Sequence, residues 1–538
     1  MDTPPQPLLT HRPELIARLA EPCHYDVIVV GGGATGLGVA LDAAVRGLRV
    51  VLVESHDFAK GTSSRSTKLV HGGVRYLAQG NIGLVREALH ERTLLLKNAP
   101  HLAQPLPFVM PTYKWWEAPF YGIGLKMYDA LAGRAGLGHT EFLSRSETLA
   151  QLPMVQTEEL KGGVKYWDGQ FNDARLALAL ARTAANRGAL LVNYCRVTSL
   201  KHDSGRVAGV VCSDQFTGQV FELNAACVIN AAGVWVDELR RLDGVAGGAA
   251  APAMQPMLAP SQGVHMVVDR AFLGGSTALM VPKTADGRVL FAVPWLGKII
   301  LGTTDTPRPD LAREPEAFED EIEFILSESA RYLRRAPKRK DVKSIWVGLR
   351  PLVKPANTEG DNTKVLSREH TILVSRSGLV TVTGGKWTTY RAMAEDVLAQ
   401  CTSHKLIRPT LAGQTKSLAL VGADTGSFEF KALCESEGLH SYGSEQTNVR
   451  ALPGAENWLC EGLSEAMVRF AVRHEYAITV EDILARRSRL LFLDARLARL
   501  MAATVAAILA DETGQDPAVA EFTDLCQHYL LESKEKVC

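Results

Sequence analysis

The chain has 538 residues, too many for one ordinary hydrophobic core, so we expect two or three domains. Lys plus Arg and Asp plus Glu both total 59, and this balance gives no indication of a nucleic-acid partner. The nine cysteines form neither a CxxC pair nor a cluster with histidine at metal-ligand spacing. Cysteine usage therefore predicts reduced thiols and no metal site.

The N-terminal 22 residues alternate proline and charge, without the apolar core or the small-residue cleavage site of a signal peptide. The apolar stretch from Leu500 to Ala510 is about half of the roughly 20 residues that a membrane-spanning helix needs. We therefore expect a cytoplasmic protein without a membrane span.

Residues 25–30 (YDVIVV) form a short apolar run rich in β-branched side chains, which is typical of a buried parallel strand. Residues 34–46 have helical composition and stop before Gly47, a suitable C-terminal cap. A second apolar run covers residues 49–53. The order predicts a strand–helix–strand unit.

A glycine fingerprint, GxGxxG, occupies the turn between the first strand and the helix, at Gly31, Gly33 and Gly36. The first glycine permits a tight turn, the second lets a pyrophosphate approach the backbone, and the third lets the helix pack closely. The helix N-terminus then faces the phosphates with unpaired N–H groups. Glu54 ends the second strand, where its carboxylate can accept hydrogen bonds from ribose hydroxyls. This context predicts a dinucleotide site, but it does not distinguish FAD from NAD.

Later segments extend this organisation. Residues 226–232 and 379–383 read as further strands of the same sheet, each ending in glycine before a helical segment. Between them, residues 240–340 are richer in proline, glycine and alternating apolar positions, which predicts an inserted antiparallel sheet. From Ala466 onward the chain reads as consecutive amphipathic helices.

A hydroxyl-rich stretch, residues 61–77 (GTSSRSTKLVHGGVRYL), runs into a His-Gly-Gly-x-Arg-Tyr turn. With this stretch the chain closely resembles the FAD-dependent glycerol-3-phosphate dehydrogenases, respiratory enzymes that pass electrons to quinone. The resemblance spans about residues 23–400. Further motifs that carry it are residues 173–176, 230–236, 302–305, 348–352 and 384–391.

The resemblance and the element pattern together imply an α/β fold. We expect a Rossmann-like FAD-binding domain, an inserted antiparallel substrate domain and an α-helical C-terminal domain. The expected boundaries are 23–105 with 160–239 and 341–407 for the FAD-binding domain, 106–159 with 240–340 for the substrate-binding domain, and 408–538 for the C-terminal domain.

The resemblance also implies a set of FAD contacts beyond the fingerprint. The expected cofactor-binding residues are Gly31, Gly33, Gly36, Glu54, Thr62, Ser63, Ser64, Ser66, Lys68, Leu69, His71, Gly72, Val197, Ala232, Gly233, Gly385, Lys386, Thr388 and Thr389.

Oxidation of a secondary alcohol moves a hydride to the flavin while a base takes the hydroxyl proton. His71 is the first candidate for this base and His265 the second. The alternative role for His71 is structural, as a histidine that hydrogen-bonds the backbone near the flavin. The resemblance places both histidines near the isoalloxazine without deciding between them.

A phosphomonoester substrate needs clustered cations and hydrogen-bond donors. By resemblance these are Arg75, Tyr76, Arg350, Arg368 and Lys386. Arg350, between Gly348 and Pro351, is the strongest candidate, and it can also stabilise the developing alkoxide. The helix that follows Lys386 can stabilise negative charge on the reduced flavin through its N-terminus.

The expected activity is oxidation of sn-glycerol 3-phosphate to dihydroxyacetone phosphate by hydride transfer to FAD, followed by electron transfer to membrane quinone. A first alternative is a glycerol-3-phosphate oxidase that reduces oxygen to hydrogen peroxide. Further alternatives are an amine or amino-acid oxidase and a flavoprotein without turnover. Several cations in the substrate site argue against both further alternatives.

Two surfaces are candidates for contact with anionic phospholipid. Trp115, Trp116, Phe120 and Tyr121, with Lys114 and Lys126 nearby, resemble a membrane-interface patch, although a core or subunit contact fits them as well. The second surface is a basic run near the C-terminus that comprises Arg486, Arg487, Arg489, Arg496 and Arg499. The alternative interpretation of this run is a solvated, salt-bridged helix face. We expect peripheral attachment to the inner face of the cell membrane, and a homodimer stays open.

Overall fold

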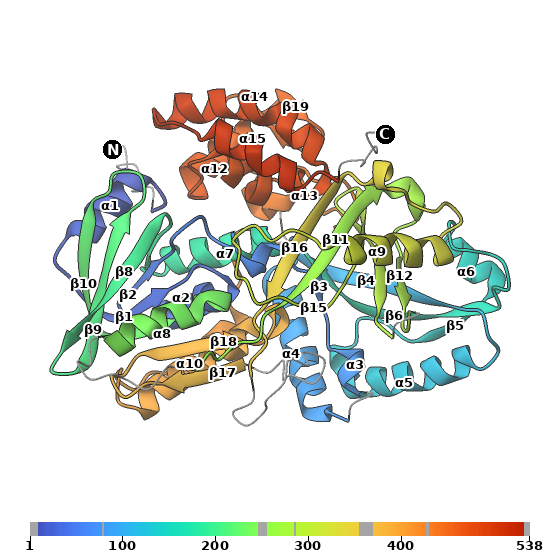
Figure 1. The fold of residues 1–538 in the computed structure, drawn as a ribbon, viewed down its shortest axis with the longest axis horizontal. Coiled ribbons are helices and arrows are strands. Elements are labelled where there is room, and N and C mark those ends of the chain that lie inside the picture. The colour runs from blue at the N-terminus through green and yellow to red at the C-terminus, as the bar shows by residue number, and fades with distance from the viewer. Residues whose placement is uncertain are drawn as a thin grey trace.

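The computed structural model describes residues 9–77, 80–245, 255–284, 287–354, 370–424, 426 and 430–531. Two large sheets lie side by side, and a group of C-terminal helices covers the junction between them (Figure 1). The predicted fold class, an FAD-binding α/β domain with an antiparallel sheet and a helical C-terminal domain, is confirmed.

The first sheet contains the predicted nucleotide-binding unit. Its central strands run in the order β18-β10-β1-β2-β7 and are parallel, whereas β17, β8 and β9 are antiparallel additions. The bounds are β1 (His24–Val30), β2 (Val50–Val53), β7 (Leu190–Val192), β8 (Cys195–Asp203), β9 (Arg206–Asp214), β10 (Val220–Asn230), β17 (His370–Val374) and β18 (Val380–Gly384).

Helices cover this sheet (Figure 1). They are α1 (Arg12–Ala20), α2 (Ala34–Val45), α7 (Asp173–Asn186), α8 (Val236–Val245) and α10 (Tyr390–Ser403). All four residues of β2 and nine of the twelve residues of α2 are buried, which explains why both are strongly apolar in sequence. The predicted strand–helix–strand unit is therefore present within one or two residues of its expected bounds.

The second sheet is mainly antiparallel, in the order β15-β11-β14-β13-β12-β4-β6-β3, with β16 on β11 and β5 on β6. Its strands are β3 (Leu69–Val70), β4 (Ala103–Thr112), β5 (Glu141–Ser144), β6 (Gly162–Phe171), β11 (Ser261–Asp269), β12 (Ala278–Val281), β13 (Leu290–Trp295), β14 (Lys298–Gly302), β15 (Thr306–Pro307) and β16 (Ser344–Arg350).

Three of these strands differ from the expected domain division. β3, β6 and β16 pair within the second sheet, although the expected boundaries assign residues 23–105, 160–239 and 341–407 to the FAD-binding domain. β3 pairs with β6 about 100 residues away, and β6 and β16 pair with β4 and β11 about 60 and 80 residues away, so no local pattern reveals the pairing. We propose that residues 162–171 and 344–350 belong to the substrate-binding domain.

The helices around the second sheet are α3 (Val74–Leu77), α4 (Ile82–Asn98), α5 (Glu117–Ala132), α6 (Arg145–Gln151) and α9 (Glu319–Tyr332). Single helical turns connect the larger elements. They are η1 (Thr62–Ser64), η2 (Gly133–Ala135), η3 (Gly233–Trp235), η4 (Arg270–Phe272), η5 (Arg339–Asp341), η7 (Trp387–Thr389), η8 (Gln414–Ser417) and η9 (Leu439–Glu445).

The C-terminal helices lie over both sheets (Figure 1). This part comprises α11 (Gln446–Arg450), β19 (Trp458–Cys460), β20 (Leu463–Ser464), α12 (Glu465–His474), the π-helical η10 (Asp482–Arg487), α13 (Leu490–Leu493), α14 (Ala495–Thr513) and α15 (Val519–His528). Among the residues that the structure describes, no helix combines the length and the apolar character that crossing a bilayer demands.

The basic C-terminal run lies largely inside the molecule, so both sequence-based readings of it are wrong for three of its five residues. Arg486, Arg487 and Arg489 are 2%, 3% and 0% exposed. The first two form ion pairs with the buried carboxylate of Asp57, which follows β2. Only Arg496 and Arg499 face solvent.

The aromatic segment before and within α5 is exposed. Trp115 is 84% exposed and Phe120 67%, and Ile123 and Met127 continue the same helical face at 63% and 54%. Tyr121 is half-buried. The core alternative is therefore wrong for this face, because a buried helix would turn these side chains inward.

Candidate active site

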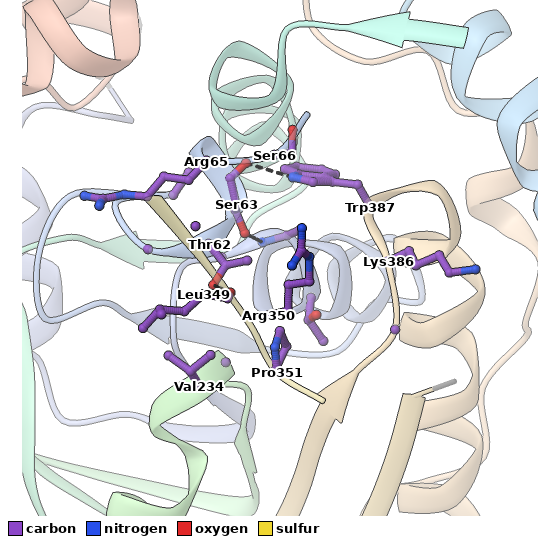
Figure 2. Close-up of a pocket in the computed structure, with 18 of the residues that line it drawn as sticks. Thr62, Ser63, Arg65, Ser66, Val234, Leu349, Arg350, Pro351, Lys386 and Trp387 are labelled. Carbon is purple, nitrogen blue, oxygen red and sulfur yellow. Dashed lines mark hydrogen bonds between the residues drawn. The ribbon is translucent and has the colours of Figure 1, made fainter. Parts of the chain in front are cut away.

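A cavity of about 980 Å³ lies where the two sheets meet. Its wall includes the glycine turn after β1, residues 59–63 and 65–67, the ends of β10 and β18, and residues 348–352 at the end of β16. Figure 2 shows Thr62 and Ser63, which follow β2 of the first sheet, close to Leu349 and Arg350 at the end of β16 in the second sheet. Both sheets therefore build one site.

The glycine turn fits a diphosphate. Gly31 has a φ of 114°, and a Cβ there would lie 2.5 Å from the carbonyl oxygen of Ala231. A Cβ on Gly36 would overlap the carbonyl oxygen of Gly31. At Gly33 an added Cβ would contact only Ser63 Oγ, at 3.1 Å, because the cavity opens in front of this residue. α2 begins directly after Gly33, so its N-terminal N–H groups face the cavity.

Glu54 is fixed at the cavity wall by backbone N–H groups. Its Oε2 accepts a hydrogen bond from Gly32 N at 2.6 Å, and its Oε1 accepts one from His56 N at 2.9 Å. Oε1 also accepts a hydrogen bond from Ser55 Oγ at 3.1 Å, whereas Oε2 can accept a further one. The position therefore suits the predicted contact with ribose hydroxyls.

The hydroxyl-rich segment ties three elements together. Thr62 Oγ1 donates to Leu349 O at 2.6 Å. Ser63 accepts twice, from Ala34 N at its Oγ (2.9 Å) and from Trp387 Nε1 at its carbonyl oxygen (2.8 Å), and Figure 2 draws the tryptophan contact. These bonds hold the turn, β16 and η7 as one wall.

Lys68 lies behind this wall. It is fully buried, and its Nζ donates to Asp173 Oδ2 at 2.6 Å and to Ser64 O at 2.7 Å. Burial lowers the pKa of Lys68 to about 7, with partial compensation from Asp173. Arg489 of the C-terminal region donates to the same carbonyl, Ser64 O, at 2.6 Å. The cluster thus supports the cofactor wall from outside the cavity.

Most expected cofactor contacts line the cavity, and some lie behind it. Gly72 is packed against α5, where its N–H donates to Tyr128 Oη at 2.9 Å. Thr389 is buried, and its Oγ1 donates to Lys386 O at 3.4 Å. The expected residues that do not line the cavity are Gly36, Ser64, Lys68, Gly72 and Thr389. Those that line it are Gly31, Gly33, Glu54, Thr62, Ser63, Ser66, Leu69, His71, Val197, Ala232, Gly233, Gly385, Lys386 and Thr388.

Both candidate bases line the cavity. His265, on β11, is 2% exposed, its Nε2 lies 2.9 Å from Thr67 Oγ1, and its ring stacks on Trp346. Burial, with smaller contributions from Lys68 and Arg350, lowers the pKa of His265 well below its usual value. His71 follows β3 and is half-buried, and its carbonyl oxygen accepts from Thr388 Oγ1 at 3.5 Å.

Arg350 ends β16 and is held by protein acceptors. Its Nη1 lies 3.1 Å from Asp305 Oδ1 and 3.2 Å from Gln262 O, and its Nη2 donates to Thr304 O at 2.9 Å. A quarter of its side chain, 24%, remains exposed to the cavity. An incoming anion therefore meets a fixed positive charge and competes with the Asp305 carboxylate for Nη1.

The other expected phosphate contacts are not gathered around Arg350. Lys386 lines the cavity, but Figure 2 shows its side chain directed away from Arg350. The backbone of Arg75 and Tyr76 forms α3, directly after Gly73; their side chains and all of Arg368 lie outside the described residues.

Several lining residues were missed by sequence reasoning. Thr303 and Asp305, which hold Arg350, belong to a motif that carried the resemblance, so the signal was present without an assigned role. Arg313 lines the opposite part of the wall with its guanidinium 3.9 Å from the ring centre of Trp235. No motif surrounds Arg313, so nothing in its sequence context predicts this position.

Cations predominate on the wall, which favours a negatively charged occupant. The lining residues include Lys60, Arg65, Arg196, Arg288, Arg313, Arg350 and Lys386, against Glu54, Asp168, Glu238 and Asp305. Within the described ranges no group of three or more His, Cys, Asp or Glu side chains is placed to hold a metal ion.

Comparison with known proteins identifies the family. The profile described as FAD dependent oxidoreductase matches residues 26–391, and the profile described as C-terminal domain of alpha-glycerophosphate oxidase matches residues 413–520. The mitochondrial glycerol-3-phosphate dehydrogenase of Mus musculus is 42% identical over 512 residues, which cover 88% of this chain and 68% of that protein.

Two solved structures have the same fold. The glycerol-3-phosphate dehydrogenase from Bacillus halodurans complexed with FAD has a TM-score of 0.75 at 29% identity, covering 98% of this chain and 99% of that one. The L-alpha-glycerophosphate oxidase of Mycoplasma pneumoniae, with FAD bound, has a TM-score of 0.55 at 18% identity, covering 73% of this chain and 98% of that one. The second likeness concerns the fold alone.

The fold, the glycine turn and the profile match over more than half of the chain define an FAD-dependent oxidoreductase. The expected cofactor, FAD, is therefore confirmed. Within that class the chain belongs to the FAD-dependent glycerol-3-phosphate dehydrogenase family, as the motifs had indicated.

Proposed function

We propose that the protein oxidises sn-glycerol 3-phosphate to dihydroxyacetone phosphate and passes the electrons to a membrane quinone. The first half follows from the family and from FAD as cofactor. Bound FAD supplies the acceptor for the hydride from the alcohol carbon. The observation that carries the substrate assignment is a fixed cation, Arg350, on the same wall as two histidines that can take the hydroxyl proton.

The proton step needs a neutral imidazole within reach of the substrate hydroxyl. His265 meets the first condition, because burial disfavours its charged form at neutral pH. Among the described residues its Nδ1 has no hydrogen-bond partner, and Thr67 Oγ1 lies beside its Nε2. His71 stays the other candidate, since it shares the cavity wall and is less buried.

Single-turnover reduction of the flavin distinguishes the two histidines. Loss of a general base slows this step by about 100-fold or more while substrate binding changes less. We expect His71→Asn to show this loss. If His265→Asn shows it and His71→Asn reduces the flavin at the wild-type rate, the base is His265.

The phosphate assignment is tested at Arg350. Arg350→Lys keeps one charge but loses the guanidinium fork, so kcat/KM for glycerol 3-phosphate should fall by about tenfold or more while FAD stays bound. Lys386→Met is the companion variant, and its side-chain direction leads us to expect a smaller loss. Unchanged kinetics in Arg350→Lys would refute the assignment.

The quinone assignment rests on the exposed apolar face of α5. A quinone is dissolved in the bilayer, so an enzyme that reduces it must contact the membrane, and an exposed apolar helix face provides such a contact. Trp115, Phe120, Ile123 and Met127 form that face. The Nζ of Lys126 lies 5.0 Å above the ring of Phe142, which puts a cation beside it for anionic headgroups.

The attachment is tested with lysates and vesicles. An apolar contact should resist salt and yield to detergent, whereas a purely electrostatic contact is released as screening shortens to about 3 Å near 1 M salt. Anionic phospholipid should raise quinone reductase activity more than dye reductase activity. Protein that ignores vesicles altogether contradicts the membrane assignment.

Oxygen is the alternative electron acceptor, because the profile that matches residues 413–520 is described from an alpha-glycerophosphate oxidase. An oxidase releases one hydrogen peroxide for each substrate oxidised in air. If the protein releases one hydrogen peroxide for each glycerol 3-phosphate oxidised, the electron acceptor is oxygen and not quinone. Dye reduction with glycerol 3-phosphate, but not with glycerol or amino acids, distinguishes the dehydrogenase and the glycerol-3-phosphate oxidase from an amine oxidase.

A further inference from the structure

The segment between β15 and α9, residues 308–318, has no regular secondary structure and contributes Arg313 to the cavity wall. We call it the strap. At its root Arg308 Nη1 donates to Glu316 O at 2.6 Å and to Gln262 Oε1 at 2.6 Å. The strap therefore belongs to the second domain and is folded back on itself.

The strap is anchored to the first domain at two points. Arg65 Nη2 lies 2.7 and 2.6 Å from the two carboxylate oxygens of Glu314. Trp235 Nε1 donates to Leu311 O at 3.1 Å. Arg65 follows the hydroxyl-rich η1, and Trp235 ends η3 after Gly233, so both anchors are parts of the cofactor wall.

The C-terminal region adds a third anchor. Tyr529 Oη donates to Glu314 Oε2 at 3.4 Å, and His528 Nδ1 lies 3.0 Å from Glu316 Oε1. Three regions of the chain thus hold the strap in place. Such a segment fixes whatever side chain it presents to the cavity.

Arg313 is the side chain that the strap presents. The central carbon of its guanidinium lies over the Trp235 ring, 3.9 Å from the ring centre. Throughout the described residues no hydrogen bond or ion pair ends on this guanidinium, although the residue is half-buried. Its five N–H donors are therefore available for hydrogen bonds with acceptor atoms of a ligand in the cavity.

The surroundings of Arg313 identify the kind of acceptor. Arg313 lies over Trp235, which closely follows Ala231, and the carbonyl oxygen of Ala231 packs against Gly31 of the glycine turn. Burial lowers the pKa of the Arg313 guanidinium, and Glu54 and Glu238 partly offset this effect. The glycine turn that suits the diphosphate lines the same cavity. The adenosine-diphosphate half of FAD brings phosphate, ribose and ring-nitrogen acceptors to this end.

We propose that Arg313 is a cofactor-retaining residue: it closes the strap over the adenosine-diphosphate half of FAD, with its guanidinium held on Trp235. The inference rests on FAD as the cofactor and is independent of the substrate and of the electron acceptor.

Release of FAD from the diluted holoenzyme, followed by flavin fluorescence, tests the proposal. Arg313→Leu should raise the dissociation constant of FAD by about tenfold or more, because it loses a charged donor. Arg313→Lys keeps the charge without the planar contact to Trp235, so its loss should be smaller. The matched control is Arg331→Leu on α9, whose side chain is 57% exposed and paired with Glu328.

The flavin-free protein is then titrated with ADP and with FMN. Arg313→Leu should weaken ADP by a factor similar to that for FAD and leave FMN unchanged, since FMN lacks the adenosine half. Equal ADP affinity in the variant and the wild type overturns the proposal, as does an equal loss for FMN and FAD.

A second variant distinguishes the contribution of the strap's anchors to FAD retention from that of Arg313 itself. Glu314→Gln weakens the anchor to Arg65 but keeps Arg313, so FAD release should accelerate by less than in Arg313→Leu. The melting temperature of each flavin-free variant shows whether it is folded. Release at the wild-type rate in Glu314→Gln contradicts the role of the anchors.

Discussion

The C-terminal arginines and the aromatic face of α5 depart from the usual distribution of side chains in opposite directions. Arg487 is 3% exposed and Arg489 0%, whereas Trp115 is 84% exposed and Phe120 67%. Buried cations require partners, and exposed apolar faces mark contact surfaces. The arginines have their partners inside the chain, and we propose that the aromatic face has its partner in the bilayer.

The difference teaches that the composition of a helix does not determine its surroundings. Asp57, the partner of Arg487, lies 430 residues away in sequence. The sequence around the arginine run does not indicate that this carboxylate, just after β2, lies next to it in the fold. The aromatic face, in contrast, has no covering element among the described residues, and its own composition was informative.

Asp57 gives the largest expected effect. Asp57→Ala leaves Arg486 and Arg487 buried beside the place of the lost carboxylate, so the free energy of unfolding should fall by about 3–5 kcal/mol. Denaturant titration of the holoenzyme measures it. Asp269→Ala, which removes a half-exposed carboxylate paired with Lys298, is the control and should cost about 1 kcal/mol or less. Similar losses in both variants would mean that the buried cluster is not special.

The aromatic face comes second. Trp115→Ser combined with Phe120→Ser should remove about 3 kcal/mol of apolar transfer, or roughly 100-fold in affinity for vesicles. Cosedimentation with liposomes checks this, with Leu411→Ser as an exposed apolar control elsewhere, at 78% exposure. Stability should stay as in the wild type. A vesicle affinity that survives the double change means that another surface binds the membrane.

Acidification should affect the buried cluster more than the rest of the molecule. Burial alone raises the pKa of Asp57, but Arg487 and Arg486 outweigh it and hold the pKa below its ordinary value of 3.8. Because the folded pKa is depressed, this stabilisation is full above the unfolded value and is lost as the pH falls through the folded value. Each unit of depression is worth about 1.4 kcal/mol.

Measuring the free energy of unfolding between about pH 7 and about pH 3 tests whether the folded state depresses the pKa of Asp57. The wild type should lose stability below the unfolded aspartate value, and Asp57→Asn should lose less, since it has no proton to take up at this position. Parallel curves for the two proteins would show that Asp57 does not titrate differently on folding.

Lys126→Gln gives the smallest expected effect. One cation near an anionic surface is worth about 1 kcal/mol, so affinity for vesicles with anionic lipid should fall about fivefold. Affinity for neutral vesicles should not change. A loss on both kinds of vesicle indicates that the aliphatic stem of Lys126 matters more than its charge.

Local elements of the fold could be predicted and distant pairings could not. β1, α2 and β2 follow from apolar runs and a glycine turn within 30 residues, so the dinucleotide site was readable. β6 and β16 look like ordinary strands, and their sheet is decided by partners far along the chain. The expected boundaries therefore differed at these two strands and at the short β3.

The same distinction holds in the site. Gly33 and Glu54 were placed from spacing alone. Lys68 sits in a motif that suggested contact with FAD, but the direction of its side chain depends on Asp173 and on three aromatic rings from distant segments. Arg313 belongs to no motif, and its position depends on where the strap is anchored.

The hydrogen bond from Arg489 to Ser64 O, together with the pair between Arg487 and Asp57, sets an order of assembly during translation. The segment after β2 leaves the ribosome early, but the side chains that neutralise and support it are encoded more than 400 residues later. Residues 57–68 therefore have no complete set of partners on a nascent chain. The pocket for FAD can therefore reach its final form only after residues 487–489 have left the ribosome, although its glycine turn is encoded within the first hundred residues.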